Sequence, residues 1–150
     1  MKENFRKRPK GSYIHEADWQ QLYLLTENWK SDLEFYRDDL RFLQNMIDKY
    51  FKHMVKKESL DEVRDIEMLM VESGRDCDRL LKRTNTHLSH LGDLIDDLFK
   101  YDSHVFRKEH EKLEDDIADF VKEVRKNRID VFTITEHVLE TEKLGQLLKQ

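Results

Sequence analysis

Residues 19–54 read WQQLYLLTENWKSDLEFYRDDLRFLQNMIDKYFKHM, and this stretch decides the fold. Its apolar side chains recur in alternating steps of three and four residues. They occupy Trp19, Leu22, Thr26, Trp29, Leu33, Tyr36, Leu40, Leu43, Ile47, Tyr50 and Met54, of which only Thr26 is polar. This spacing places them on one helix face, and a sustained average period of 3.5 indicates packing against partner helices. The pattern predicts one long helix over residues 14–57.

The same spacing returns twice further along the chain and predicts two more helices, over residues 60–100 and 104–148. Ser59 and Glu62 have the spacing of a capping box at the start of the second helix. Ser103 is the expected N-cap of the third. The second row occupies Val63, Ile66, Met70, Ser73, Cys77, Leu80, Thr84, His87, Leu91, Leu94, Leu98 and Tyr101. The third occupies Phe106, His110, Leu113, Ile117, Phe120, Val124, Asn127, Val131, Ile134, Val138, Thr141, Gly145 and Leu148.

The third helix has an alternative interpretation, a break near residues 127–132. Residues 129–135 are rich in β-branched side chains, and Thr133 and Glu136 form a second candidate capping box. We favour a continuous helix, because a break gives no reason for the apolar phase to match on both sides of it.

Short links between helices of similar length require them to run up, down and up. The sequence therefore predicts an all-α fold, an elongated antiparallel three-helix bundle with coiled-coil-like packing, as one domain over residues 13–150. It resembles a spectrin-type repeat in architecture only, and no motif names a family. Residues 1–12 form a basic tail, expected to be a flexible terminus, with a weak contact to an anionic partner as the alternative.

Composition narrows the classes of function. The chain has 150 residues, a net charge of −5, 39% charged residues and only four glycines and one proline. Scarce turn residues argue against a sheet-rich fold, and the acidic balance argues against general nucleic-acid binding. No apolar run approaches the roughly 20 residues of a membrane span. The single cysteine, Cys77, fits a reducing compartment, so we expect a cytoplasmic protein.

A second apolar face lies beside the main row. Phe35 and Phe42 are seven residues apart, with Met46 one turn further on, and Phe132 and Leu139 repeat the pattern on the third helix. Ile129 is close to them in sequence. One interpretation is a wide core stripe. The other, which we favour, is an interface between two copies, giving a homodimer.

The sequence contains no motif for catalysis. It lacks a glycine-rich phosphate loop, Glu-x-x-His and His-Glu-x-x-His, so we expect no enzyme, no cofactor and no identified small-molecule substrate. The weak candidate metal ligands are His87, His90 and Asp116, which antiparallel pairing of the second and third helices would bring together. The alternative is that His87 is a hydrogen-bonded core residue, packed against Trp29, and His90 a surface residue.

The middle of the second row is unusually polar, and Asn127 is its counterpart on the third helix. Small and polar seam residues can make room for a ligand, so the alternative function is a metal- or small-ligand-binding bundle that uses Cys77, Thr84, His87 and Asn127. Cys77 itself is expected to be a small core residue rather than a reactive thiol. The favoured function is non-enzymatic: protein–protein interaction or scaffolding through the helix faces, with self-association.

Overall fold

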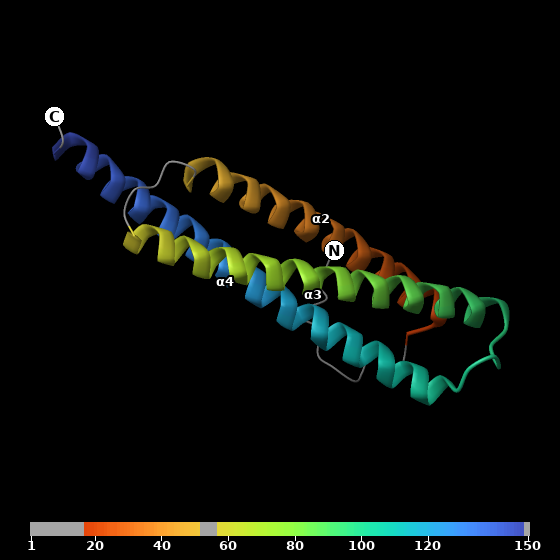
Figure 1. Cartoon of the computed structure of the whole chain (residues 1–150). Coiled ribbons are helices and arrows are strands. Elements are labelled where there is room, and N and C mark those ends of the chain that lie inside the picture. The colour runs from red at the N-terminus through yellow and green to blue at the C-terminus, as the bar shows by residue number, and fades with distance from the viewer. Residues whose placement is uncertain (1–16, 52–56, 149–150) are drawn as a thin grey trace.

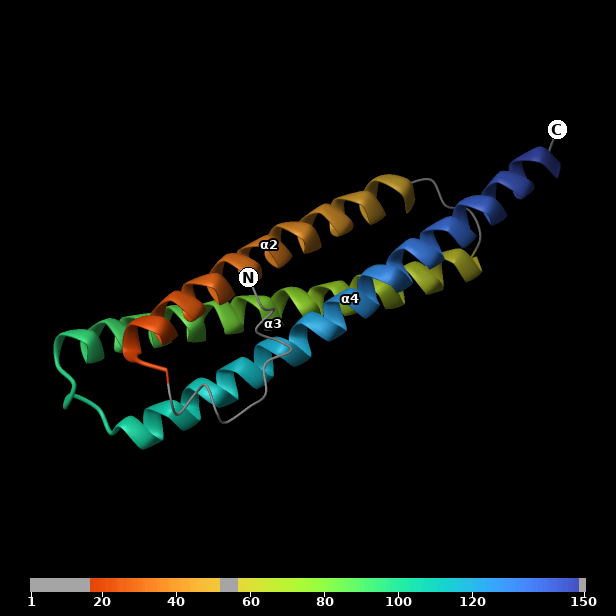
Figure 2. The ribbon, with the colours of Figure 1, turned by 180° about the vertical axis from the view of Figure 1, so that it is seen from behind.

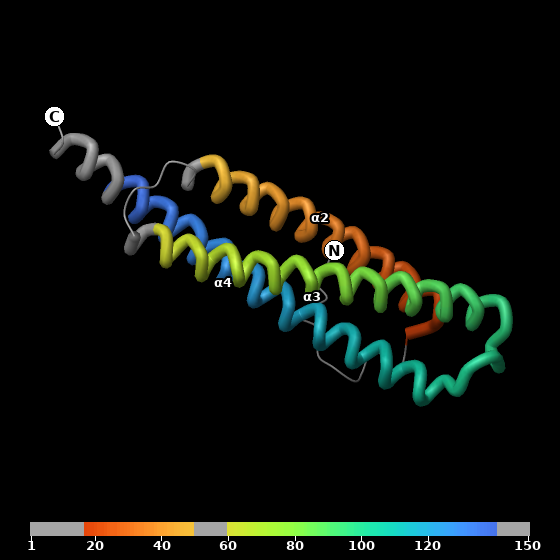
Figure 3. Tube along the Cα trace, in the orientation of Figure 1, coloured from red at the N-terminus to blue at the C-terminus, as the bar shows by residue number. Residues whose placement is uncertain are grey.

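The computed structural model describes residues 17–51 and 57–148, with side chains described over 17–49 and 60–140. Three helices occupy most of these ranges: α2 (Trp19–Phe51), α3 (Lys57–Asp96) and α4 (Ser103–Leu148). They lie along one another in an elongated bundle (Figure 1), and the described ranges contain no strand. The Cα trace shows α2 and α4 running in one direction and α3 in the other (Figure 3). The predicted up-down-up three-helix bundle is confirmed.

The predicted rows of side chains form the core. On α3, every row position from Val63 to Leu94 is buried, including the polar ones. Most of the core is one continuous cluster in which α2 contributes Trp29 and Leu43 and α4 contributes Ile117 and Val138. A smaller cluster closes the end of the bundle near the α3–α4 link, where Leu22, Leu91, Leu94 and Phe106 meet. The fold therefore follows from the apolar period alone.

The third helix is continuous. α4 runs unbroken through 46 residues, so the alternative break near 127–132 does not occur. Val131 and Val138 are both buried, which keeps the same face inward on either side of the suspected break. The Thr135 hydroxyl donates to the carbonyl of Val131 within the helix (2.6 Å). The candidate capping box at Thr133 and Glu136 thus lies inside α4 and begins no helix.

The helix starts differ from the predicted ones. Asp18 and Gln21 form a reciprocal capping box at the start of α2, in which each side chain accepts the other's backbone N–H (2.7 and 2.9 Å). α3 begins at Lys57, so Ser59 lies inside the helix and the capping box predicted there is wrong. The predicted residues 14–16, 52–56 and the basic tail 1–12 lie outside the described residues.

The α3–α4 link also differs from prediction. α3 ends at Asp96, four residues early, because a tight turn follows in which Asp97 Oδ1 accepts the N–H of Phe99 (3.1 Å). Asp102, and not Ser103, caps α4: its Oδ1 accepts the N–H groups of His104 and Val105 (3.0 and 3.1 Å). Both residue types are favoured N-caps, and the backbone path of the link places the Asp102 carboxylate on these N–H groups.

The three helices do not approach one another equally. α3 packs closely along α2 and less closely along α4, while α2 and α4 approach each other least. The view from behind in Figure 2 faces the side of the bundle formed by α2 and α4. None of the helices in the described part of the chain is both long and apolar enough to cross a membrane.

Candidate functional site

The second apolar face is largely exposed. Phe35 and Phe42 on α2 retain 63% and 57% of their surface, and on α4 Ile129 retains 65% while Phe132 and Leu139 retain 41% each. These five residues are called the α2–α4 patch below. Met46, predicted to belong with them, is partly buried and packs against the core instead. The wide-stripe interpretation therefore fits Met46 but not the five patch residues.

Polar contacts hold the two halves of the α2–α4 patch on one side of the bundle. Arg128 on α4 forms an ion pair with Asp39 on α2. The same guanidinium lies 5.2 Å from the centre of the Phe132 ring. Since Asp39 lies between Phe35 and Phe42 in sequence, this contact places the two aromatic residues of α2 at about the same height along the bundle as Phe132.

The polar side chains in the middle of the seam form hydrogen bonds with other groups of the bundle. The Cys77 thiol donates to the Leu33 carbonyl (3.3 Å), and Thr84 donates to the Leu80 carbonyl (2.7 Å). Burial raises the pKa of Cys77 to about 11, and the Asp78 carboxylate adds to this. The thiol therefore stays protonated at neutral pH, and the prediction that Cys77 is a buried core residue is confirmed.

The remaining seam residue, Asn127, is also engaged. Its Nδ2 donates to the Ser73 hydroxyl across the α3–α4 contact (3.0 Å), and both side chains are buried. The polar groups of Cys77, Thr84 and Asn127 are thus all hydrogen-bonded inside the bundle. The three grooves along the helices are lined by other residues.

Two histidines meet in the seam. His87 Nε2 and His110 Nδ1 are 2.8 Å apart, and the His87 ring stacks on Phe106 with 4.5 Å between ring centres. His110, not His87, packs on Trp29 (4.7 Å), so the contact predicted for His87 is wrong in its partner. His110 Nε2 is buried and makes no hydrogen bond within the described residues.

Both imidazoles are held neutral. Burial lowers the pKa of His87 to about 4, and interactions with the nearby His90 and Arg83 side chains act in the same direction. Burial likewise lowers the pKa of His110 to about 3, with His87 and Arg107 adding to the effect. A neutral pair can share one hydrogen bond, with one ring donating and the other accepting.

The three candidate metal ligands are engaged separately. Asp116 accepts from Arg83 (2.7 Å) and Lys112 (3.4 Å), while the His90 ring packs on Tyr101 (5.0 Å). His87 faces His110. Within the described ranges, no group of three His, Cys, Asp or Glu side chains could hold a metal ion. Asp116 pairs with Arg83 because Arg83, one turn before His87 on α3, lies opposite Asp116 on α4.

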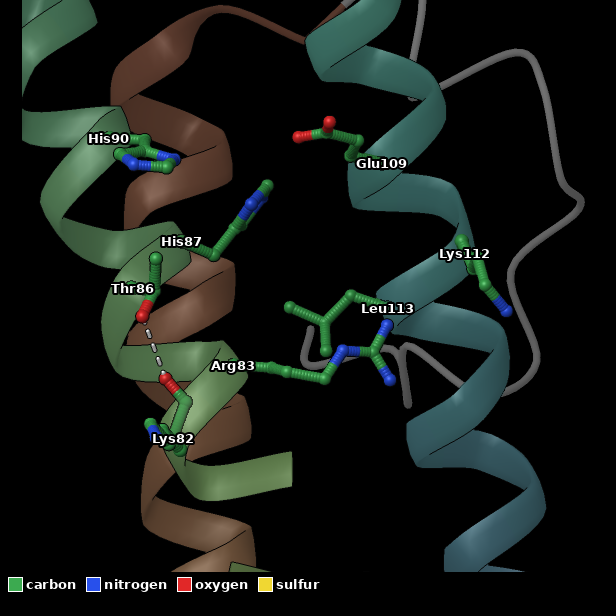
Figure 4. Close-up of a pocket in the computed structure, with 8 residues that line it drawn as sticks. All are labelled: Lys82, Arg83, Thr86, His87, His90, Glu109, Lys112 and Leu113. Carbon is green, nitrogen blue, oxygen red and sulfur yellow. Dashed lines mark hydrogen bonds between the residues drawn. The ribbon is translucent and has the colours of Figure 1, made fainter. Parts of the chain in front are cut away.

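A groove of about 350 Å³ runs between α3 and α4 beside the histidine pair. Figure 4 shows Arg83, His87 and Leu113 reaching into the space between the two helices. The one hydroxyl among the lining residues, Thr86, donates to the Lys82 carbonyl (3.1 Å). The groove is lined by Lys82, Arg83, Thr86, His87, His90, Glu109, Lys112 and Leu113. It offers a binding surface of mixed charge rather than a paired nucleophile and base.

Comparisons with known proteins add no relative. The chain matches no family model, no curated protein and no solved structure. The site must therefore be judged on its own geometry.

Proposed function

We propose that this protein is a non-enzymatic helical bundle that acts by protein–protein interaction through the α2–α4 patch, and that it forms a homodimer. The observation that carries this proposal is the exposure of Phe35 and Phe42 beside Phe132. Burying one such side chain is worth roughly 2–3 kcal/mol. Exposed apolar clusters of this kind commonly mark interaction surfaces, and here the cluster lies on the side where the bundle's own helices approach least.

The size of the patch sets the expected affinity. From Lys122 to Leu139 the α4 face is about 25 Å long at 1.5 Å per residue. With α2 beside it, the face is roughly 20 Å wide, the width of two helices. The surface area of a face of this length and width lies near the lower end for specific protein–protein interfaces. We therefore expect a reversible dimer with a dissociation constant on the order of micromolar.

Sedimentation equilibrium over a wide concentration range tests the proposal. The wild-type mass should rise toward that of two chains, whereas Phe42→Asp should stay monomeric with nearly unchanged helicity. Met68→Asp is the matched control, because Met68 is also exposed (66%, against 57% for Phe42) but lies on α3. This variant should dimerise like the wild type. A wild type that stays monomeric throughout, or a dimeric Phe42→Asp, contradicts the proposal.

We further propose a cytoplasmic location. Its support is chemical: the single cysteine is buried, its thiol stays protonated, and the fold needs no disulfide. Cell fractionation of the tagged protein is the test, and recovery from an oxidising compartment would exclude this location.

The second candidate function is ligand binding, and the groove beside His87 is the observation that favours it. Of the four mid-seam residues predicted to bind a ligand, only His87 lines this groove. Thermal shift with Zn²⁺, Fe²⁺ and Mn²⁺ and with small organic anions tests it, alongside elemental analysis. A shift with wild type that is lost in the groove-filling Thr86→Trp supports the candidate, and no shift with any probe removes it.

A further inference from the structure

Outside the core, α2 and α4 each carry a second row of side chains at the same spacing of three and four. The α2 row contains Phe35, Asp38, Phe42, Asn45 and Lys49, and the α4 row contains Lys122, Arg125, Ile129, Phe132, Glu136 and Leu139. All eleven side chains are exposed. A row at this spacing lies along one helix face, where its apolar members can pack against a further helix. The five apolar members of these rows are the α2–α4 patch, and the described residues leave both rows uncovered.

The charges in these two rows have opposite order. Along α2, the acidic Asp38 precedes the basic Lys49, whereas along α4 the basic Arg125 precedes the acidic Glu136. The separation is eleven residues in both rows. Aligned in the same direction, the rows present opposite charges to each other at Asp38 and Arg125 and at Lys49 and Glu136. Between these charges, Phe42 and Asn45 of α2 lie opposite Ile129 and Phe132 of α4.

The register within one chain fixes which residues of α2 and α4 lie at the same height. Asp39 contacts Arg128 at a separation of 89 residues, and Ala17 contacts Arg107 at 90. Asp38 and Arg125 are 87 residues apart, as are Phe42 and Ile129, and Lys49 and Glu136. The difference of two or three residues is about 4 Å along a helix, which a long side chain spans.

We propose that the occupant of the α2–α4 patch is a second copy of this chain, related by a two-fold axis parallel to the helices. Such an axis keeps heights and directions and exchanges sides, so the α2 row of each copy lies on the α4 row of the other. Asp38 then faces the partner's Arg125, Lys49 faces the partner's Glu136, and Phe42 packs on the partner's Ile129. This arrangement rests on the proposed function and is an isologous, closed dimer.

A two-fold axis perpendicular to the helices is the competing arrangement. It lays each row antiparallel on itself, with Phe42 against the partner's Phe42 and Asp38 against the partner's Asn45, so the acidic group of α2 meets no cation. The parallel axis satisfies Asp38, Lys49, Arg125 and Glu136 together. In both arrangements the apolar side chains supply the affinity, and the charges choose the orientation.

Charge reversal tests the arrangement. Asp38→Arg and Arg125→Asp should each raise the dimer dissociation constant about fivefold by sedimentation equilibrium, and the double variant should return to within about twofold of wild type. Helicity is measured alongside, because Asp38 lies 3.9 Å from both Arg37 and Arg41 on its own helix. Arg75→Asp, an exposed position on α3, is the matched control and should leave the constant unchanged.

The outcomes separate the two proposals. Rescue by the double variant supports the parallel two-fold. Loss of the dimer in Phe42→Asp without rescue by the charge swap leaves the proposed function standing and overturns the arrangement. A disulfide-linked dimer of Phe42→Cys on mild oxidation also overturns it, because only the perpendicular axis brings the two positions together. A wild type that is monomeric at every concentration overturns both.

Discussion

His87 Nε2 and His110 Nδ1 lie 2.8 Å apart in the buried seam between α3 and α4. Their surroundings are aromatic, with Phe106 stacked on one ring and Trp29 on the other. Besides burial, interactions with Arg83 and His90 lower the pKa of His87, and interactions with Arg107 and His87 lower that of His110. Burial and these neighbours oppose protonation of the pair, which makes it a determinant of acid stability.

Stability should fall as the pH drops below neutrality. Unfolded histidines titrate near pH 6.5, while the pKa values in the folded chain are lowered to about 4 and about 3. Between these pKa values the unfolded state binds more protons than the folded state. The contribution of the histidine pair to the free energy of unfolding is therefore fully present above pH 6.5 and is lost progressively below it. At pH 5 the loss is up to about 2 kcal/mol for each imidazole.

Urea unfolding at pH 7.5, 6 and 5 measures this loss. The comparison is His87→Gln/His110→Gln, whose side chains can still hydrogen-bond but do not titrate. The stability advantage of wild type over this variant should be largest at pH 7.5 and shrink toward pH 5, while contributions from the other titrating groups cancel in the difference. Parallel pH curves for the two proteins would show that the pair does not control acid stability.

The start of α4 gives a second prediction, about helix capping. Asp102→Ala removes the acceptor for the N–H groups of His104 and Val105 and should lower the free energy of unfolding by about 1 kcal/mol. For a chain of this size that is a decrease in Tm of about 2–4 °C, measured by circular dichroism. Ser103→Ala is the neighbouring control and should cost a few tenths of a kcal/mol at most. A larger loss from Ser103→Ala would return the cap to Ser103.

The sequence predicted the fold because the core obeys one period. Leu33, Met70 and Val124 are buried for the reason their spacing gives, and the phase that continues past Asn127 correctly indicated an unbroken α4. Helix ends were predicted less well. Ser103 and Asp102 are both good caps in isolation, and only the backbone path of the α3–α4 link decides between them.

Side-chain pairing across the seam was harder to predict than burial. His87 and His110 were both placed in the seam, but their contact depends on the register of α3 against α4. For antiparallel helices, the position numbers of facing residues have a nearly constant sum, and Arg83–Asp116 and Ser73–Asn127 obey the same rule. That rule was the available signal. The His87, His90 and Asp116 grouping failed because Asp116 falls opposite Arg83.

The third prediction concerns the buried pair of Ser73 and Asn127, which we expect to hold α3 and α4 in register. Asn127→Ala leaves the Ser73 hydroxyl buried without its donor and should cost about 1–3 kcal/mol. Ser73→Ala likewise leaves the Asn127 amide buried without its acceptor and should destabilise the fold to a similar degree. The double variant should cost less than the sum of the two, by about 1 kcal/mol, in a double-mutant cycle measured by urea unfolding.

A slip of one heptad shows why this pair restricts register. Moving α4 by seven residues against α3 would place Asn127 opposite Ile66 or Leu80, where its amide finds no partner in an apolar surrounding. The apolar positions alone allow that slip, because the row repeats every seven residues. Ser73→Ala/Asn127→Leu should therefore keep most of the stability while unfolding with a smaller m-value than wild type, as alternative registers become populated. Additive single-variant costs together with an unchanged m-value would contradict a register role.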